Sequence, residues 1–122
     1  MTQLTFDYQL NLLLQADDLR HLRIMCSGNI AVLPEAPCEP HLLSADAVAK
    51  LVATFQTKDP VERIAVDDTT LALDFASGLR VEVHDCGYES WTVHGKDYAV
   101  GCDGGDVIWG LPTGSDWTTW FA

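Results

Sequence analysis

Apolar and polar residues alternate along much of the chain, as they do in strands that bury one face. Over residues 4–12 an apolar side chain falls at every second position, which predicts one strand there. Leu10, Leu13 and Leu14 also fit helical spacing, so a helix beginning near residue 10 stays open. Two short apolar runs follow, on either side of the Ser-Gly-Asn sequence at residues 27–29, and they predict a hairpin.

One segment has the period of a helix instead. Its apolar residues recur at spacings of three and four and would form one stripe, made of Val48, Leu51, Val52 and Phe55. Ser44 precedes the stripe as a candidate N-cap, and Pro60 follows it as a breaker. We therefore predict a helix over about 44–57, after an extended Pro-rich loop over residues 34–42.

The rest of the chain is predicted to be a meander of antiparallel hairpins. Short alternating runs are separated by turn residues, chiefly Gly and Asp. The predicted strands cover residues 61–66, 71–75, 79–84, 89–93, 98–102 and 107–111. The predicted class is α+β: a mostly antiparallel sheet meander with one main helix packed on one face. A chain of 122 residues fits a single domain, residues 1–122.

Negative charge is concentrated in the second half of the chain. The net charge is −11, and residues 59–122 hold twelve Asp or Glu against three Lys or Arg. Such a surface repels nucleic acid and anionic membranes and attracts basic proteins. Acidity that serves solubility alone is the competing interpretation. The same half contains all four tryptophans, a residue type that often anchors protein interfaces.

The acidic residues fall mostly at or near the predicted turns. If the strands ending at residues 84, 93, 102 and 111 are sequential neighbours, several of those turns share one sheet edge. Mutual repulsion there would be relieved by a cationic partner. We therefore predict a partner-binding surface with two aromatic anchors, composed of Asp85, Glu89, Asp97, Tyr98, Asp103, Asp106 and Trp109.

Few residues support catalysis or metal binding. His84 and Cys86 are two apart on a predicted strand and could share a face, with His94 as a further member of a Cys/His hydrolase. A residue that would orient the base cannot be assigned. Cys38 and His41 form one closely spaced pair, whereas structural zinc sites normally have two. We predict no catalytic residue, no metal and no cofactor.

The sequence also carries expectations about compartment and assembly. The first residues show no basic segment followed by an apolar run, and the four cysteines lack C-x-x-C spacing. We expect a cytoplasmic protein with reduced thiols, as a monomer or weak dimer. The aromatic residues at 117–121 leave open a structural subunit that buries this tail in an oligomer.

A motif in the second half resembles that of a family of small bacterial domains of unknown function. It reads Leu71-x-Leu73-x-Phe75-x-x-Gly78-x-x-Val81-x-Val83, followed by Tyr88-Glu89-Ser90-Trp91. The resemblance covers residues 61–111. It implies an acidic immunity protein of a contact-dependent or polymorphic toxin system, without catalytic residues.

Together, charge and resemblance predict an immunity protein that binds and neutralises a cognate bacterial toxin. A nuclease-type toxin fits, because its basic phosphate-binding cleft complements an acidic surface. An anti-defence inhibitor that mimics nucleic acid is the alternative with the same acidic face. A small Cys/His-dependent hydrolase is the less favoured one.

Overall fold

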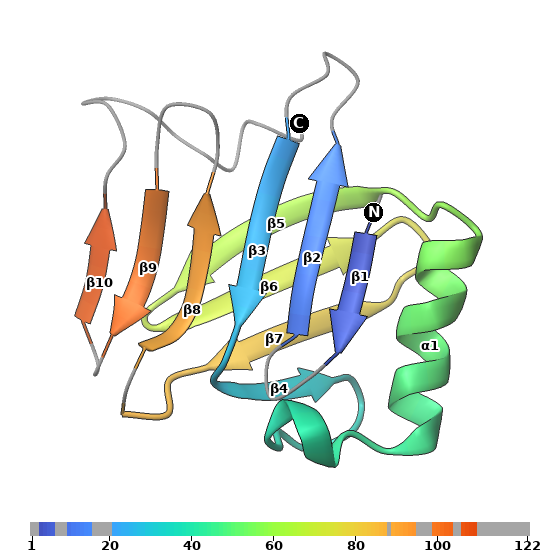
Figure 1. Ribbon diagram of the computed structural model, residues 1–122, viewed down its shortest axis with the longest axis horizontal. Coiled ribbons are helices and arrows are strands. Elements are labelled where there is room, and N and C mark those ends of the chain that lie inside the picture. Colours follow the sequence, from blue (N-terminus) through green and yellow to red (C-terminus); the bar gives the residue numbers. More distant parts are fainter. Residues whose placement is uncertain are drawn as a thin grey trace.

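The computed structural model describes residues 3–6, 10–15, 21–87, 89–94, 99–103 and 106–109. Within these residues the chain forms ten strands, one α-helix and one 3₁₀ helix (Figure 1). The helices are α1 (Ala45–Gln56) and η1 (Pro40–Leu42). The strands are β1 (Gln3–Phe6), β2 (Leu10–Gln15), β3 (His21–Cys26), β4 (Asn29–Val32), β5 (Val61–Asp67), β6 (Thr70–Phe75), β7 (Arg80–His84), β8 (Glu89–His94), β9 (Ala99–Asp103) and β10 (Asp106–Trp109).

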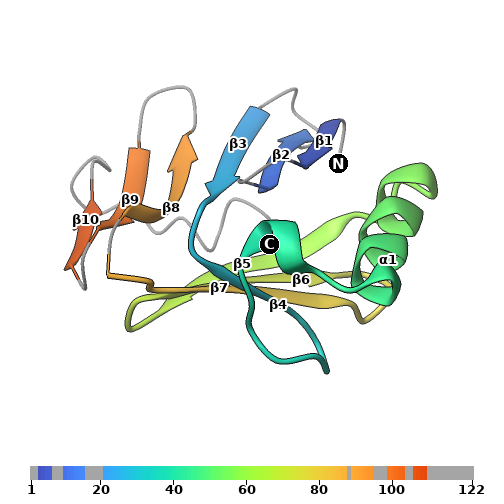
Figure 2. The ribbon, with the colours of Figure 1, turned by 60° about the horizontal axis from the view of Figure 1, so that its bottom comes forward.

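The strands form two antiparallel sheets stacked face to face. The six-stranded sheet has the order β1-β2-β3-β8-β9-β10, and the four-stranded sheet has the order β4-β7-β6-β5. Their strands cross steeply, and α1 lies at one end of the two layers, next to β1 (Figures 1 and 2). The predicted α+β class, with antiparallel strands and one main helix, is confirmed. The meander is divided between two layers.

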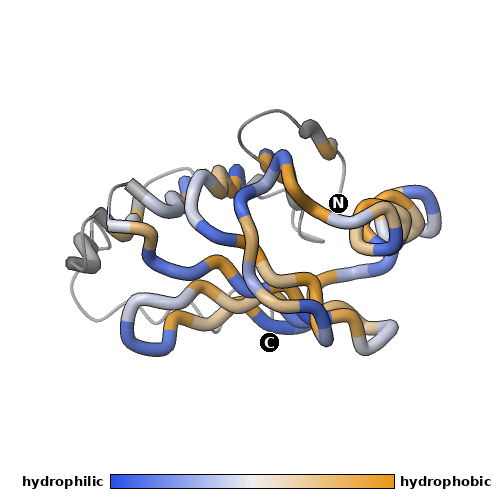
Figure 3. The backbone as a smooth tube through the Cα atoms, turned by 90° about the horizontal axis from the view of Figure 1, so that it is seen from below, coloured by the Kyte–Doolittle hydropathy of each residue, from blue (hydrophilic) through white to orange (hydrophobic). Residues whose placement is uncertain are grey.

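The core lies between the two sheets. The alternating apolar residues of both sheets form one buried cluster, to which α1 contributes Ala47 and Leu51. Figure 3 shows how hydrophobic and hydrophilic stretches follow one another along the backbone of the strands and of α1. The largest fully buried side chains of the strands are Trp91, Phe75, Leu10, Leu12, Ile24, Ile30, Ile64, Leu71 and Leu73. Burial of this apolar surface is the main stabilising contribution to the fold.

The hairpin predicted around residues 27–29 is wrong. β3 pairs with β2 and β8, whereas β4 pairs with β7 in the other sheet. Between them, at Ser27 and Gly28, the chain bends from one layer into the other. Between β7 and β8 the chain returns from the four-stranded sheet to the six-stranded one. The result is one long antiparallel ladder bent at a corner, which is how strands switch layers in orthogonal packings.

The single strand predicted over residues 4–12 is also wrong, because the chain reverses within it. β1 and β2 are antiparallel partners, with Leu4 opposite Leu12 and Phe6 opposite Leu10. Directly opposed residues share a face, so the alternating pattern continues through the reversal and conceals it. Residues 10–15 form β2, not the start of a helix.

The helix prediction is confirmed. Ser44 is the N-cap, and its Oγ accepts a hydrogen bond of 3.0 Å from the Ala47 amide. The predicted apolar stripe is partly wrong: the buried residues of α1 are Ala47, Leu51 and Thr54, while Phe55 is 37% exposed. Thr54 tolerates burial because its hydroxyl donates to the Lys50 carbonyl over 2.9 Å.

The Pro-rich segment is more structured than the extended loop predicted for residues 34–42. Cys38 forms an isolated bridge with Ile30, with hydrogen bonds of 2.7 and 3.0 Å, and Pro40–Leu42 is the 3₁₀ helix. The segment therefore covers the outer edge of β4. In the part of the chain that the structure describes, no helix is long and apolar enough to cross a membrane.

The later strands follow the sequence pattern closely. β5, β6 and β7 coincide with the predicted runs, and the register places Leu71 opposite Val83 and Leu73 opposite Val81, as the alternation requires. Gly78 has a φ of +96° in the turn between β6 and β7, a conformation that glycine adopts without steric cost. The proposed aromatic tail at residues 117–121 lies outside the described residues.

Candidate functional site

Strand register brings three of the predicted acidic residues together. Glu89 is paired with Asp103 across β8 and β9, and Asp103 is paired with Asp106 across β9 and β10. We call these three residues the acidic row; they lie at one end of the last three strands (Figure 1). Opposed residues in such ladders have Cα atoms about 4.5–5.5 Å apart. Like charges at that separation are destabilising unless something neutralises them.

Asp85 has a different environment from the acidic row. The shared edge predicted for Asp85 required the strand before it to be a neighbour of β8 in one sheet, but β7 belongs to the four-stranded sheet. Asp85 therefore lies where the chain changes layers. Its half-buried carboxylate accepts hydrogen bonds from the Gly87 amide at 3.0 Å and the Ser90 hydroxyl at 3.1 Å. These bonds hold the segment between β7 and β8 in place. The contact of Asp85 with a partner stays a prediction.

The other predicted contacts stay predictions as well. Asp97 and Tyr98 lie outside the described residues. Trp109 is the last residue of β10 and lies at the opposite end of this strand from Asp106. It pairs with Val100, which pairs with the buried Val93. The acidic row and Trp109 are therefore separated by the length of the strand.

A corner that joins the two sheets begins next to Glu89, the first member of the acidic row. We define the corner as residues 27–28 and 85–87 together with Ser90. The Ser90 carbonyl accepts hydrogen bonds from the amides of Ser27 and Gly28, at 2.9 and 2.6 Å. Its buried hydroxyl accepts another from the Cys86 amide at 2.9 Å. Ser90 thus ties both bent strands together from the position next to Glu89.

Two local features make the corner possible. The register of β8 with β9 shifts between Glu89 and Trp91, so Ser90 occupies a bulge and is released from regular pairing. Gly28 allows the close approach: a Cβ there would collide with the His84 carbonyl oxygen and lie 2.9 Å from the Ser90 Cβ. The corner was not predicted from the sequence, where its local signal is a glycine flanked by short polar residues.

On the outer face of the four-stranded sheet, one arginine pairs with two carboxylates and offsets part of their charge. The Arg80 guanidinium contacts Asp74 at 3.1 Å and Glu82 at 2.9 Å. The hydrogen bond from Arg80 holds the pKa of the Glu82 carboxyl below its usual range, and the same bond raises the pKa of Arg80. His84 Nε2 lies 3.3 Å from the other Glu82 oxygen, in an ion-pair contact that lacks hydrogen-bond geometry. This face is therefore less suited than the acidic row to attract a cation.

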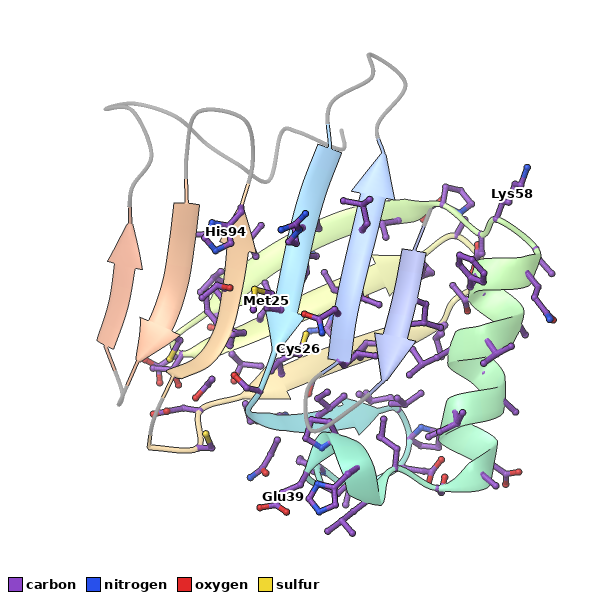
Figure 4. The ribbon with its side chains drawn as sticks, in the orientation of Figure 1. Met25, Cys26, Glu39, Lys58 and His94 are labelled. Carbon is purple, nitrogen blue, oxygen red and sulfur yellow. The ribbon has the colours of Figure 1, made fainter. Side chains whose placement is uncertain are left out.

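The residues considered for catalysis contact different partners. His84 faces Glu82, and the Cys86 sulfur lies 3.4 Å from the Ser90 hydroxyl. His94 is exposed at the other end of β8 (Figure 4). His41, considered for zinc, lies 3.4 Å from Glu39. Within the described ranges no three His, Cys, Asp or Glu residues are grouped to hold a metal ion.

The four cysteines are all free thiols. Cys26 and Cys102 are fully buried and stand opposite Trp91 on its two neighbouring strands. Burial raises the pKa of the Cys26 thiol to about 12, so almost none of it is thiolate at neutral pH. Cys38 and Cys86 are half-buried. Cys26 thus serves as an apolar core residue.

Two antiparallel sheets, one bent ladder between them and one helix at their end define a small α+β domain. The chain belongs to a family of unknown function, DUF6188, whose model matches residues 1–110. The match confirms a small domain of unknown function and extends over the first half of the chain as well. No curated protein and no solved structure matches the chain.

Proposed function

We propose that this protein is an immunity protein that captures and neutralises a basic, nuclease-type bacterial toxin through the acidic row. The observation that carries the proposal is the register that aligns Glu89, Asp103 and Asp106 on three adjacent strands. It supports the proposal because a fold does not need aligned carboxylates, and they weaken the sheet by mutual repulsion. A cationic partner converts that repulsion into attraction.

The net charge of the chain supports the same partner class. At −11 the protein attracts a basic partner over a distance and accelerates their encounter. A nuclease needs a positively charged cleft for the phosphates of its substrate, so an acidic edge can occupy that cleft and block it. Arg80 forms its ion pairs with Asp74 and Glu82, on the other sheet.

Reversal of charge in the acidic row tests the proposal. The test protein is the full chain with Asp103→Lys and Asp106→Lys, used to capture proteins from host extract at low and high salt. The matched control carries Glu62→Lys and Asp67→Lys, which change the net charge equally at exposed positions of β5. We expect a cationic protein bound by the wild type and the control at low salt, and lost from both at high salt.

The row variant should lose that protein at low salt while its unfolding midpoint stays at or above the wild-type value, because Asp103→Lys removes the like-charge pairing with Glu89. Equal capture by the row variant would show that the acidic row is not part of the interface. The identity of the captured protein separates the two inhibitor hypotheses. A toxin encoded beside this gene supports immunity, whereas a host defence nuclease would assign the chain to the nucleic-acid mimics.

A further inference from the structure

The sheet edges differ in how the described residues cover them. Cys38 pairs with β4, and α1 packs beside β1. β5 has a register shift between Val61 and Arg63 and exposed charges at Glu62 and Arg63, two features that prevent strand addition. β10 has no register shift and one charged residue, Asp106; among the described strands it is paired with β9 alone.

The β10 edge begins at the acidic row. Its first residue, Asp106, is the last member of that row, and its next three residues, Val107, Ile108 and Trp109, are apolar types that favour strands. In an antiparallel ladder every second residue directs its backbone N–H and C=O away from the neighbour. On the side of β10 away from β9, where none of the described strands lies, these groups can pair with an added strand. The edge therefore combines backbone pairing groups with a fixed negative charge at one end.

We propose that β10 is the docking strand for the basic partner, which adds an extended cationic segment alongside it. This inference rests on the proposed function and specifies its geometry. Backbone hydrogen bonds along residues 106–109 would supply the pairing, and cationic side chains of the added strand would face the acidic row. The charge favours a basic strand: a lysine or arginine of the added segment beside Asp106 is attracted, whereas an acidic residue there is repelled.

A defined peptide tests the docking strand without knowledge of the natural partner. The probe is a short peptide of alternating lysine and valine, added to the ¹⁵N-labelled full chain. Its control is the same peptide methylated at every backbone nitrogen, which keeps the charge but cannot pair as a strand. Hydrogen exchange of the amides in residues 106–109 is the readout.

We expect the unmethylated peptide to slow exchange at alternate amides of β10 and to bind about tenfold more tightly than the methylated one. Exchange in β5, the edge with a register shift, should not change. Asp103→Lys with Asp106→Lys should abolish both the binding and the protection. The unfolding midpoint of this variant confirms that it is folded.

The contrary outcomes separate this inference from the proposed function. Equal binding of both peptides without protection would overturn strand addition while the acidic row still captures cations. Protection that persists in the lysine variant would contradict the inference that the added segment must be basic. Absence of binding by either peptide at millimolar concentration would overturn the docking strand. Protection without peptide, accompanied by a dimer in sedimentation, would assign the edge to a second copy.

Discussion

The indole of Trp91 donates a hydrogen bond from Nε1 to the carbonyl oxygen of Thr69 over 2.9 Å. Trp91 is fully buried in β8 of the six-stranded sheet, and Thr69 lies in the turn between β5 and β6 of the four-stranded sheet. The bond therefore connects the two layers across the core. It also gives the indole N–H the partner that a buried tryptophan needs.

Replacement Trp91→Phe should lower the free energy of unfolding by about 2–4 kcal/mol. The Thr69 carbonyl would lose its donor, at a cost of about 1–3 kcal/mol, and the smaller ring would leave unfilled space. Urea unfolding followed by circular dichroism measures the change. A loss below about 0.5 kcal/mol would show that the Thr69 carbonyl finds another partner.

Replacement Gly28→Ala should be among the most destabilising single-methyl additions in this chain, at about 3 kcal/mol. The new Cβ would press on the His84 carbonyl and on Ser90, both of which the corner holds in place. Gly78→Ala is the matched control. It adds a methyl into open space at a φ of +96°, and should cost only about 1–2 kcal/mol from backbone strain.

Thermal unfolding compares the two variants in one experiment. An equal loss in both would mean that the corner relaxes around a side chain at position 28. If Gly28→Ala does not fold at all while Gly78→Ala does, the difference in folded yield makes the same comparison.

The sequence predicted the local elements well where neighbouring residues determine them. The Ser44 cap and the turn at Gly78 depend on residues within a few positions, so α1 and the β6–β7 hairpin were predicted with nearly correct bounds. The bend at Gly28 depends instead on Ser90, far along the chain. An alternating pattern shows which residues face a core but not to which of two sheets a strand belongs.

Glu82 gives the stability a defined dependence on pH. Its folded pKa lies below the ordinary value of 4.5 because Arg80 donates a hydrogen bond to it. The ionised carboxylate therefore stabilises the fold above about pH 4.5, and the contribution is lost as pH falls through the lowered folded pKa. Because Arg80 is 38% exposed, we expect only about 0.5–1 kcal/mol from this pair.

Comparison of wild type with Glu82→Gln over acidic pH measures this contribution. The difference in unfolding free energy should be constant from neutral pH to about 4.5 and shrink at lower pH. Glu62→Gln, at an exposed position of β5, should show a smaller difference at every pH. A Glu82→Gln difference that grows on acidification would contradict the assigned direction of the shift.

The cysteines should react in an order set by burial. In the native protein at pH 8, iodoacetamide should modify Cys38 and Cys86 first, since both are half-buried. Cys26, with its pKa near 12, should react only after unfolding. Peptide mapping by mass spectrometry measures each rate. Rapid native modification of Cys26 would show that the core around it opens without global unfolding.

Part of the candidate site was predictable because residues close together in the sequence determine it. The short connection from Asp103 to Asp106 indicated a tight hairpin, and the structure pairs these two residues directly. Glu89 joined them because β8 and β9 are also sequential neighbours. The bonds of Asp85 to Ser90 and Gly87 were not predictable, since they depend on a bulge that has no sequence signature here.

The whole four-stranded sheet lies in the sequence between β3 and β8 of the six-stranded sheet, and this affects how the chain folds. Residues 29–84 supply the whole four-stranded sheet and α1, and they intervene between β3 and β8, which are adjacent in the six-stranded sheet. Contacts between Ile24 and Val93 must therefore close a long loop, which is entropically slow unless the intervening segment is already compact. Pulse-labelling hydrogen exchange should show protection in β6 and β7 before β3 and β8. Simultaneous protection would mean that both layers form in one step, with the corner as their shared nucleus.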